Sequence, residues 1–232
     1  MTLKLILAFV IAFAVSAVVG FFLVPYLKRI KAGQSIKENG PTWHMSKQGT
    51  PTMGGLMFIA AIAVVCLSVG FDCMAEGEYG HLFCLAFALV FGAIGFLDDY
   101  EKLRKKQNLG LTAGKKLLLQ LAAAVAFIFL MRRFGYVALD SLYIPFWNTT
   151  VAISEPLYVI FAAFVIIGTV NAVNITDGID GLSSSVTVPV AVFFAVLGGM
   201  WQGFGQLGVF AGALVGGLLG FLCYNHYPAK VF

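Results

Sequence analysis

The sequence predicts an all-α polytopic membrane protein with about seven transmembrane helices. Of its 232 residues, 60% are hydrophobic and only 11% are charged, and the mean hydropathy is +0.91. Crossing a hydrocarbon core of about 30 Å takes roughly 20 apolar residues, and the charged residues gather between such runs rather than inside them. We therefore expect residues 1–232 to form a single integral membrane domain.

The charges and the cysteines argue against two other classes of protein. The net charge of +4 is modest and is concentrated in loops, which favours a role in membrane topology and gives no support to nucleic-acid binding. The four cysteines show no CxxC spacing and lie mostly in apolar runs. That pattern is typical of small buried hydrophobic residues rather than of a disulfide framework or a zinc site.

The first apolar run, residues 5–27, contains no charged residue and is long enough to cross the membrane with some tilt. A cleaved signal peptide is the alternative, because Lys4 precedes the run and small residues occur near positions 14–17. The run is too long for that interpretation and continues past any cleavage point. We expect a retained helix.

Six further spans follow. They are expected at residues 52–71, 82–97, 117–131, 157–173, 184–200 and 207–224. Between the fourth and fifth spans, Tyr143, Phe146 and Trp147 predict an interfacial aromatic patch on the outer side. Most Lys and Arg residues fall on the other side, and the exceptions are Lys4, Arg132 and Arg133. The positive-inside rule then predicts the N-terminus outside and three cytoplasmic loops, at residues 28–55, 98–116 and 174–183.

The stretch NAVNITDGIDGL carries a polar side chain at every third position, namely Asn171, Asn174, Asp177 and Asp180. On an ideal α-helix these positions spread over half the circumference, whereas a 3₁₀ turn aligns them in one row. Gly178 and Gly181 favour a tightened or broken helix here. Two carboxylates and two carboxamides together suit Mg²⁺. The alternative is a polar helix cap, but polar residues at a membrane boundary are more often functional.

Three other polar clusters are expected on the same face. The segment GTPTMGG at residues 49–55 offers hydroxyls and bare backbone N–H groups that can approach a phosphate or a uracil edge, although such a string is also ordinary loop sequence. The third span runs directly into Asp98 and Asp99, which repel each other unless a cation or lysine lies beside them. One interpretation is that the two aspartates simply mark the end of the helix. The other is that one acts as a base and the other organises a metal or a phosphate. In the basic segment that follows, Lys102 and Lys116 are best placed to neutralise a substrate phosphate.

Clustered carboxylates, lysines and glycine-rich backbone at an inner membrane surface suit phosphoryl transfer, in which cations neutralise charge that develops on phosphate oxygens. A lipid phosphate acceptor would explain why such an enzyme lies in the bilayer. A cation-coupled transporter is the alternative, since it also uses Asp and Asn beside broken helices. Its ionisable groups should lie near the membrane midplane, whereas these all lie at one edge.

Several blocks of the sequence resemble the phospho-N-acetylmuramoyl-pentapeptide transferase family, which has ten membrane helices. The blocks are GPTWHMSKQGTPTMGG, GFLDDYEK, NLGL, Lys116 with Gln120, NAVNITDGIDGL and YPAKVF, in the family order. The first and fifth differ from the corresponding blocks of the related UDP-N-acetylglucosamine polyprenyl-phosphate transferases, which are the nearest alternative. Glu101 and Trp43 depart from the family pattern, and we expect them to affect substrate affinity more than the type of reaction.

The resemblance implies Mg²⁺-dependent transfer of phospho-MurNAc-pentapeptide from UDP-MurNAc-pentapeptide to undecaprenyl phosphate, with release of UMP, at the cytoplasmic face of the bacterial inner membrane. By matching position it implies Asp98 as the base on the lipid phosphate, with Asp99 beside it. It also implies that Asn174 and Asp177 organise the metal, and that Asp180 acts with them on the nucleotide and the sugar phosphate. The remaining residues implied to line the substrate site are Lys47, Thr52, Lys116 and Asn171, and homodimers are usual in the family.

The family continues beyond the block that here ends at Val231 and Phe232, with a further metal-binding aspartate, three more spans and a histidine-rich loop. We therefore expect these 232 residues to be a fragment. It would retain the Asp98 and Asp99 pair and the polar residues at 171–180, yet be catalytically silent alone, because preorganised charge is the main resource of phosphoryl transfer.

Overall fold

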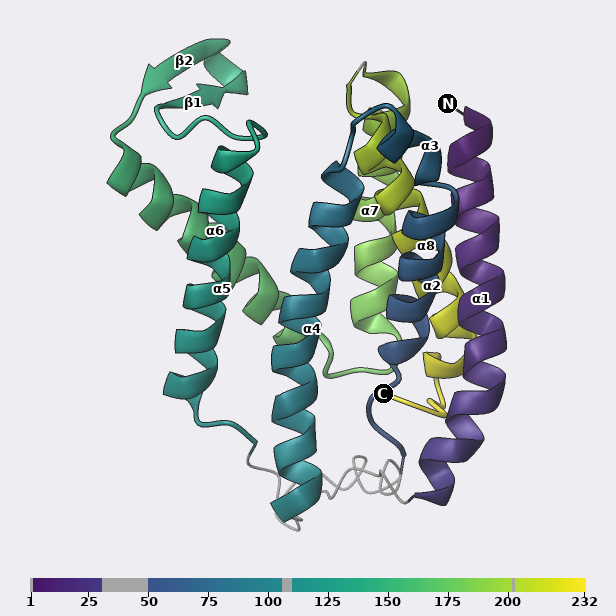
Figure 1. Ribbon diagram of the computed structural model, residues 1–232. Helices are drawn as coiled ribbons and strands as arrows, with labels where there is room; N and C mark the ends of the chain where they lie inside the picture. Colours follow the sequence, from purple (N-terminus) through teal and green to yellow (C-terminus); the bar gives the residue numbers. More distant parts are fainter. Residues whose placement is uncertain (1, 31–49, 106–109, 202) are drawn as a thin grey trace. The chain divides into compact units, whose positions relative to one another are not determined.

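The computed structural model describes residues 2–30, 50–105, 110–201 and 203–232. The chain divides into two compact units, one formed by Met1–Gly110 with Thr176–Phe232 and the other by Leu111–Ile175. Both units are mainly helical (Figure 1). This confirms the predicted all-α class.

The larger unit is a helix bundle. Its helices are α1 (Thr2–Arg29), α2 (Leu56–Ser68), α3 (Phe71–Ala75), α4 (Gly80–Lys105), α7 (Leu182–Met200) and α8 (Gly205–Asn225). Helix α8, yellow in Figure 1, packs against α1, α2, α4 and α7, and it is the most buried of the membrane-length helices. The core of this unit is therefore built around α8.

Glycines allow α8 to approach α1 closely. A Cβ atom added at Gly220 would lie 2.8 Å from the carbonyl oxygen of Phe13 on α1, and one at Gly216 would fall directly on the carbonyl oxygen of Phe9. No residue with a side chain fits at such positions without moving the helices apart. In a bilayer, where lipid tails are as apolar as the helix surfaces, this close backbone contact is a main source of helix association.

Two hydrogen bonds join the same pair of helices. The Ser16 hydroxyl donates to the carbonyl oxygen of Gly217 at 2.8 Å, and the Tyr224 hydroxyl donates to the carbonyl oxygen of Ala17 at 2.8 Å. Residue numbers rise together along both helices at these contacts, so α1 and α8 run parallel. Ser16 is completely buried, so its bond to α8 satisfies a polar group that would otherwise be costly in an apolar interior.

The predicted second span, residues 52–71, is a broken helix. Helix α2 has 13 residues, about 20 Å at 1.5 Å per residue, which is short of the thickness of the hydrocarbon core. It ends at Ser68, and α3 begins after Gly70. A Cβ atom at Gly70 would lie 2.6 Å from the His81 ring nitrogen Nε2, so the break brings the chain against α4.

The other six predicted spans each correspond to a helix long and apolar enough to cross a membrane within the described residues: α1, α4, α5, α6, α7 and α8. The helices extend beyond the predicted limits. In particular, α4 continues to Lys105, past the expected end at residue 97. Asp98 and Asp99 therefore lie within the last turns of a helix and do not mark its end.

The smaller unit contains two long helices and a hairpin. Its elements are α5 (Ala113–Arg133), β1 (Ser141–Ile144), the 3₁₀ helix η2 (Pro145–Trp147), β2 (Thr149–Ala152) and α6 (Glu155–Thr176), all but the last residue of which belongs to this unit. The strands pair antiparallel, with Ser141 opposite Ala152. Arg132 and Glu155 form an ion pair between the ends of α5 and α6. The hairpin was not predicted, and Phe146 and Trp147 of the predicted aromatic patch are exposed at its tip.

Candidate functional site

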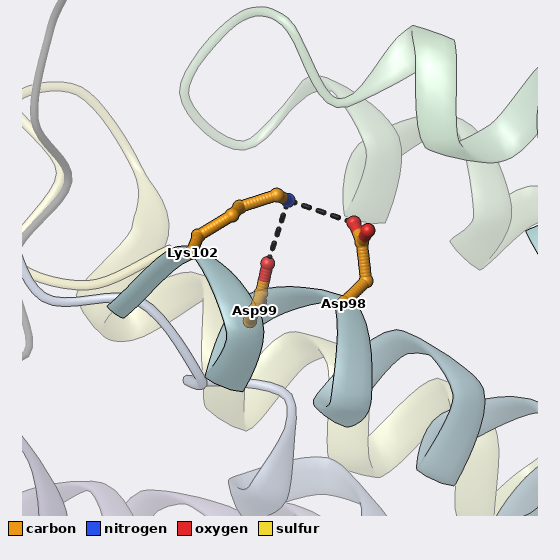
Figure 2. A network of polar contacts seen from close by, with 3 residues as sticks. All are labelled: Asp98, Asp99 and Lys102. Carbon is orange, nitrogen blue, oxygen red and sulfur yellow. Dashed lines mark hydrogen bonds and ion pairs between the residues drawn. The ribbon is translucent and has the colours of Figure 1, made fainter. Parts of the chain in front are cut away.

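Asp98, Asp99 and Lys102 form a compact ionic cluster near the end of α4 (Figure 2). The Lys102 Nζ atom lies 2.8 Å from Asp98 Oδ2 and 2.9 Å from Asp99 Oδ1. These spacings of four and three residues place all three side chains on one side of the helix. Asp98 is only 9% exposed. The lysine therefore offsets the repulsion between two adjacent carboxylates, one of which is nearly buried.

Gly110 presses its backbone against this cluster. A Cβ atom added at Gly110 would lie 2.8 Å from the Asp98 carboxyl carbon and would collide with its Oδ1 atom. Gly110 belongs to the larger unit, as Asp98 does. The backbone at Gly110 thus lies against Asp98, at a position where only glycine leaves room for the carboxylate.

Neighbouring charges on α4 are paired as well. Glu101, which departs from the family pattern, forms an ion pair with Lys105 at 2.6 Å. Lys102 and Lys105 therefore each bind a carboxylate of their own helix. The predicted role of Lys102 towards a substrate phosphate stays a prediction, and its observed partners are the two aspartates.

Residues 177–181, here called the Asp180 turn, are hydrogen-bonded to the end of α8 and to the segment after it, residues 226–232. Asp180 Oδ2 accepts a hydrogen bond from the backbone N–H of Ala229 at 3.0 Å. The N–H of Gly181 donates to Asn225 Oδ1 at 3.0 Å. Gly181 has a φ of +72° and precedes the first residue of α7, a left-handed conformation that glycine adopts without strain. This glycine lets the chain turn sharply from Asp180 into α7.

The loop of residues 50–55, here called the Thr52 loop, is hydrogen-bonded to the same segment. The Phe232 N–H donates to the carbonyl oxygen of Pro51 at 2.8 Å, and the Gly54 N–H donates to the carbonyl oxygen of Phe232 at 2.6 Å. Thr52 is half-buried between these two bonds. Lys47 and Trp43 lie outside the described residues.

The predicted row of polar residues from Asn171 to Asp180 does not form. Helix α6 is a regular α-helix through Thr176, so Asn171 and Asn174 are on it, while Asp177 and Asp180 lie in the following turn. The 3₁₀ alignment is wrong because no glycine interrupts the helix before Gly178. Asn171 and Asn174 also belong to the smaller unit, and the two aspartates to the larger one.

In the smaller unit, Asn171 joins its two long helices. Its Nδ2 atom donates to Gln120 Oε1 on α5 at 2.8 Å and to the carbonyl oxygen of Ile167 at 2.9 Å. Gln120 is buried. Asn174 is exposed and Lys116 half-exposed. The substrate-binding roles of Asn171, Asn174 and Lys116 stay predictions. Asn171 also has a structural role, because it joins α6 to α5 through Gln120.

The residues at the end of α6 offer oxygen ligands for a cation. Within the described residues, no three His, Cys, Asp or Glu side chains lie close enough together to hold a metal ion. Mg²⁺ in phosphate-transfer sites is commonly held by one or two carboxylates, with waters and substrate phosphates completing the shell. The carboxylate of Asp177 and the carboxamide of Asn174 fit that requirement in donor chemistry.

Sequence reasoning missed two residues of this region, Gly110 and Asn225. Gly110 lies within the NLGL block, but only the fold shows that it contacts Asp98. Asn225 is a buried polar residue at the end of an apolar helix. A polar residue at that place in a membrane helix is itself a sign of a special role, and it could have been identified on that ground.

The fold and the site together define a polytopic membrane protein with acidic and polar loops at one end of a helix bundle. Residues 81–232 match the model of glycosyl transferase family 4, and residues 47–59 match signature 1 of the phospho-N-acetylmuramoyl-pentapeptide-transferases. The chain belongs to the phospho-N-acetylmuramoyl-pentapeptide-transferase family, as the resemblance of its blocks predicted.

Three relatives of that name illustrate the similarity. The protein from Clostridium botulinum (strain Alaska E43 / Type E3) is 44% identical over 97% of this chain and 67% of its own length. The one from Heliobacterium modesticaldum is 43% identical over 99% and 69%. The one from Staphylococcus carnosus is 41% identical over 96% and 68%. The similarity thus extends over nearly all of this chain and about two thirds of each relative.

Proposed function

We propose that the protein transfers phospho-MurNAc-pentapeptide from UDP-MurNAc-pentapeptide to undecaprenyl phosphate, giving a lipid-linked peptidoglycan precursor and UMP. The observation that carries this proposal is the 44% identity, over 97% of the chain, to a phospho-N-acetylmuramoyl-pentapeptide-transferase. The geometry supports it: nearly buried Asp98, its partner Lys102 and the Asp180 turn all belong to one helix bundle of membrane type. A membrane location brings the enzyme to a lipid acceptor.

Asp98 is the proposed base towards the lipid phosphate, with Asp99 beside it. Its burial places a carboxylate where water competes little for hydrogen bonds. Lys102 holds both carboxylates within 2.9 Å of its ammonium group, which fixes their orientation. A positioned general base contributes typically 10²–10⁴-fold to a rate.

Mg²⁺ is the proposed cofactor, with Asn174 and Asp177 as its protein ligands. When bound, a divalent cation neutralises charge that develops on the transferred phosphate. Thr52, Asp180, Lys47, Lys116 and Asn171 are the proposed substrate-binding residues. The protein is proposed to lie in the bacterial inner membrane as a homodimer, with the N-terminus outside and the site on the cytoplasmic face.

The test is release of UMP by a full-length family member that carries these residues, in membranes supplied with polyprenyl phosphate and Mg²⁺. Parallel reactions receive UDP-MurNAc-pentapeptide or UDP-N-acetylglucosamine. Release with the first donor alone is expected, whereas release with the second alone would assign the protein to the related N-acetylglucosamine-phosphate transferases. Chelation with EDTA should abolish release, and added Mg²⁺ should restore it.

A further inference from the structure

Gln120 on α5 is a polar residue in an otherwise apolar buried stripe, and it pairs with Asn171 on α6. Gln120 is 2% exposed, and the stripe continues along α5 through Ala124, Ile128 and Met131. The Asn171 side chain donates to Gln120 Oε1 at 2.8 Å. Both residues belong to the smaller unit. A buried carboxamide in a membrane helix is costly unless it is hydrogen-bonded, so its presence in this stripe indicates a specific role.

The neighbours of the Asn171 amide determine which way it points. A backbone carbonyl oxygen accepts hydrogen bonds and cannot donate them, so the Asn171 atom that lies 2.9 Å from the carbonyl oxygen of Ile167 is the amide nitrogen. The same nitrogen faces the Gln120 side chain, whose facing atom must then be its oxygen. Two acceptors therefore bind the two N–H groups of one amide. The polar atom that Asn171 can offer to a ligand is its oxygen, Oδ1.

The Asn171 oxygen is accessible to a ligand. In the part of the chain that the structure describes, Oδ1 makes no hydrogen bond, and it is not one of the buried atoms that lack a partner. A hydrogen bond between two carboxamides also holds membrane helices together. Such a purely structural pair would lower stability when it is broken, but it would not discriminate between two substrates. The two roles can therefore be separated by kinetics.

An oxygen in this orientation selects among the chemical groups of the two substrates. Phosphate oxygens are acceptors, as is Asn171 Oδ1, so the two do not form a hydrogen bond. The lipid acceptor consists of a phosphate and a hydrocarbon chain, whereas the UDP-sugar carries hydroxyl and amide N–H groups that can donate. Lys116 lies four residues before Gln120, on the same side of α5, and its ammonium group suits a phosphate. Asn171 and Lys116 are thus complementary in what they can bind.

We propose that Gln120 is a positioning residue that orients the Asn171 amide, so that Asn171 Oδ1 accepts a hydrogen bond from a hydroxyl or amide N–H group of the UDP-sugar. This inference rests on the proposed function. Gln120 does not itself touch the substrate. Its loss lets the Asn171 amide rotate, which weakens binding of the UDP-sugar and leaves binding of the lipid phosphate, whose proposed partner is Asp98 on α4, unchanged.

The experiment measures UMP release by a full-length family member that carries these residues. Gln120→Met removes the acceptor and keeps an unbranched side chain of similar length. It is expected to raise KM for the UDP-sugar by about fivefold and to change KM for polyprenyl phosphate by less than about twofold. Gln206→Met is the matched control, because Gln206 is also buried on a membrane helix and accepts a backbone N–H, that of Gly80, in the larger unit. It should lower Tm and leave both KM values unchanged.

Two substitutions of Asn171 itself test the direction of its hydrogen bond to the substrate, even if Gln120→Met does not purify as a folded protein. Asn171→Asp keeps an outward oxygen, and Gln120 can turn its own amide to donate to the new carboxylate. We expect KM for the UDP-sugar to rise by about threefold in Asn171→Asp and by about tenfold in Asn171→Ala. If Asn171 instead donated to a phosphate, the carboxylate would repel that phosphate, and Asn171→Asp would be the more damaged variant.

That reversed order, or an equal rise in both KM values in Gln120→Met, would overturn the inference. Absence of UMP release by the unmodified protein would instead contradict the proposed function, so the two failures are distinguishable.

Discussion

Lys102 links two carboxylates that adjacent backbone positions force close together. The sequence predicted that Asp98 and Asp99 need a nearby cation, and Lys102 fills that place through i,i+4 and i,i+3 spacing on α4. This contact could be predicted from the sequence because side chains three and four residues apart lie on the same side of an α-helix. The contact of Gly110 with Asp98 was not readable, because it depends on how the chain returns after α4.

Asp98→Asn is expected to lower kcat for transfer by about 10²–10⁴-fold, because the substitution removes the proposed base. Binding of the UDP-sugar should stay within a few fold, since other residues supply it. The measurement, made in a full-length family member that carries these residues, is UMP release together with equilibrium binding of the nucleotide sugar. Asp72→Asn is the control, because Asp72 is exposed and pairs with Lys4 at 3.1 Å. Turnover like that of the unmodified protein in Asp98→Asn would contradict the base assignment.

Gly110→Ala should impair catalysis through Asp98. The added methyl would collide with the carboxylate, so Asp98 must leave its bond to Lys102 or the backbone must move. We expect kcat to fall by about tenfold or more. Gly95→Ala on α4 is the control, since a Cβ atom there meets nothing within 4 Å. Equal kcat values in the two variants would show that the close approach at Gly110 has no catalytic role.

At the scale of elements, apolar length and charge predicted six helices well, whereas local backbone detail was harder. Helix α2 breaks at Gly70, where the chain meets His81 of α4, a tertiary contact with no local sequence pattern. The hairpin was missed because its strands have only four residues each, too few for strand alternation to stand out. Residues 171–176 stayed α-helical although most of them are weak helix formers, because no glycine follows Asn171 before Gly178.

Gly216→Ala is expected to destabilise the packing of α8 on α1. The new Cβ atom would fall on the carbonyl oxygen of Phe9, and overpacking of this kind costs about 1–3 kcal/mol. Gly168→Ala on α6 is the control, because no atom lies within 4 Å of its added Cβ and alanine favours the helix. Thermal unfolding in detergent should give a lower Tm for the first variant only. A Tm unchanged by Gly216→Ala would show that the two helices separate at little cost.

For the whole molecule, the residues expected to form one site are divided between two units. Asp98, Thr52 and Asp180 belong to the larger unit, and Lys116 and Asn171 to the smaller one. The sequence predicts that these residues lie on one side of the membrane, because hydropathy and the distribution of Lys and Arg indicate which loops share a side. It could not report distances among them, which depend on helix packing.

The shared side can be tested by labelling single cysteines in a background without the native ones. Ile179→Cys and Lys115→Cys, one in each unit, should react with a membrane-impermeant maleimide from the cytoplasmic side. Thr150→Cys in the hairpin should react only from the opposite side, because α5 and α6 are each long and apolar enough to cross the membrane once between these loops. Labelling of Ile179→Cys and Lys115→Cys from different sides would refute the predicted topology.

The hydrogen bond from Ser16 to Gly217 spans 201 positions of the sequence, and this has a consequence for biosynthesis. Translation at about 5–20 residues per second separates the appearance of α1 from that of α8 by about 10–40 s. During that interval α1 is in the membrane without the glycine face that it will later pack against. Helix α2, which also packs on α1, is made much earlier, so it is the face of α1 towards α8 that lipid or the insertion machinery must cover until the parallel partner emerges.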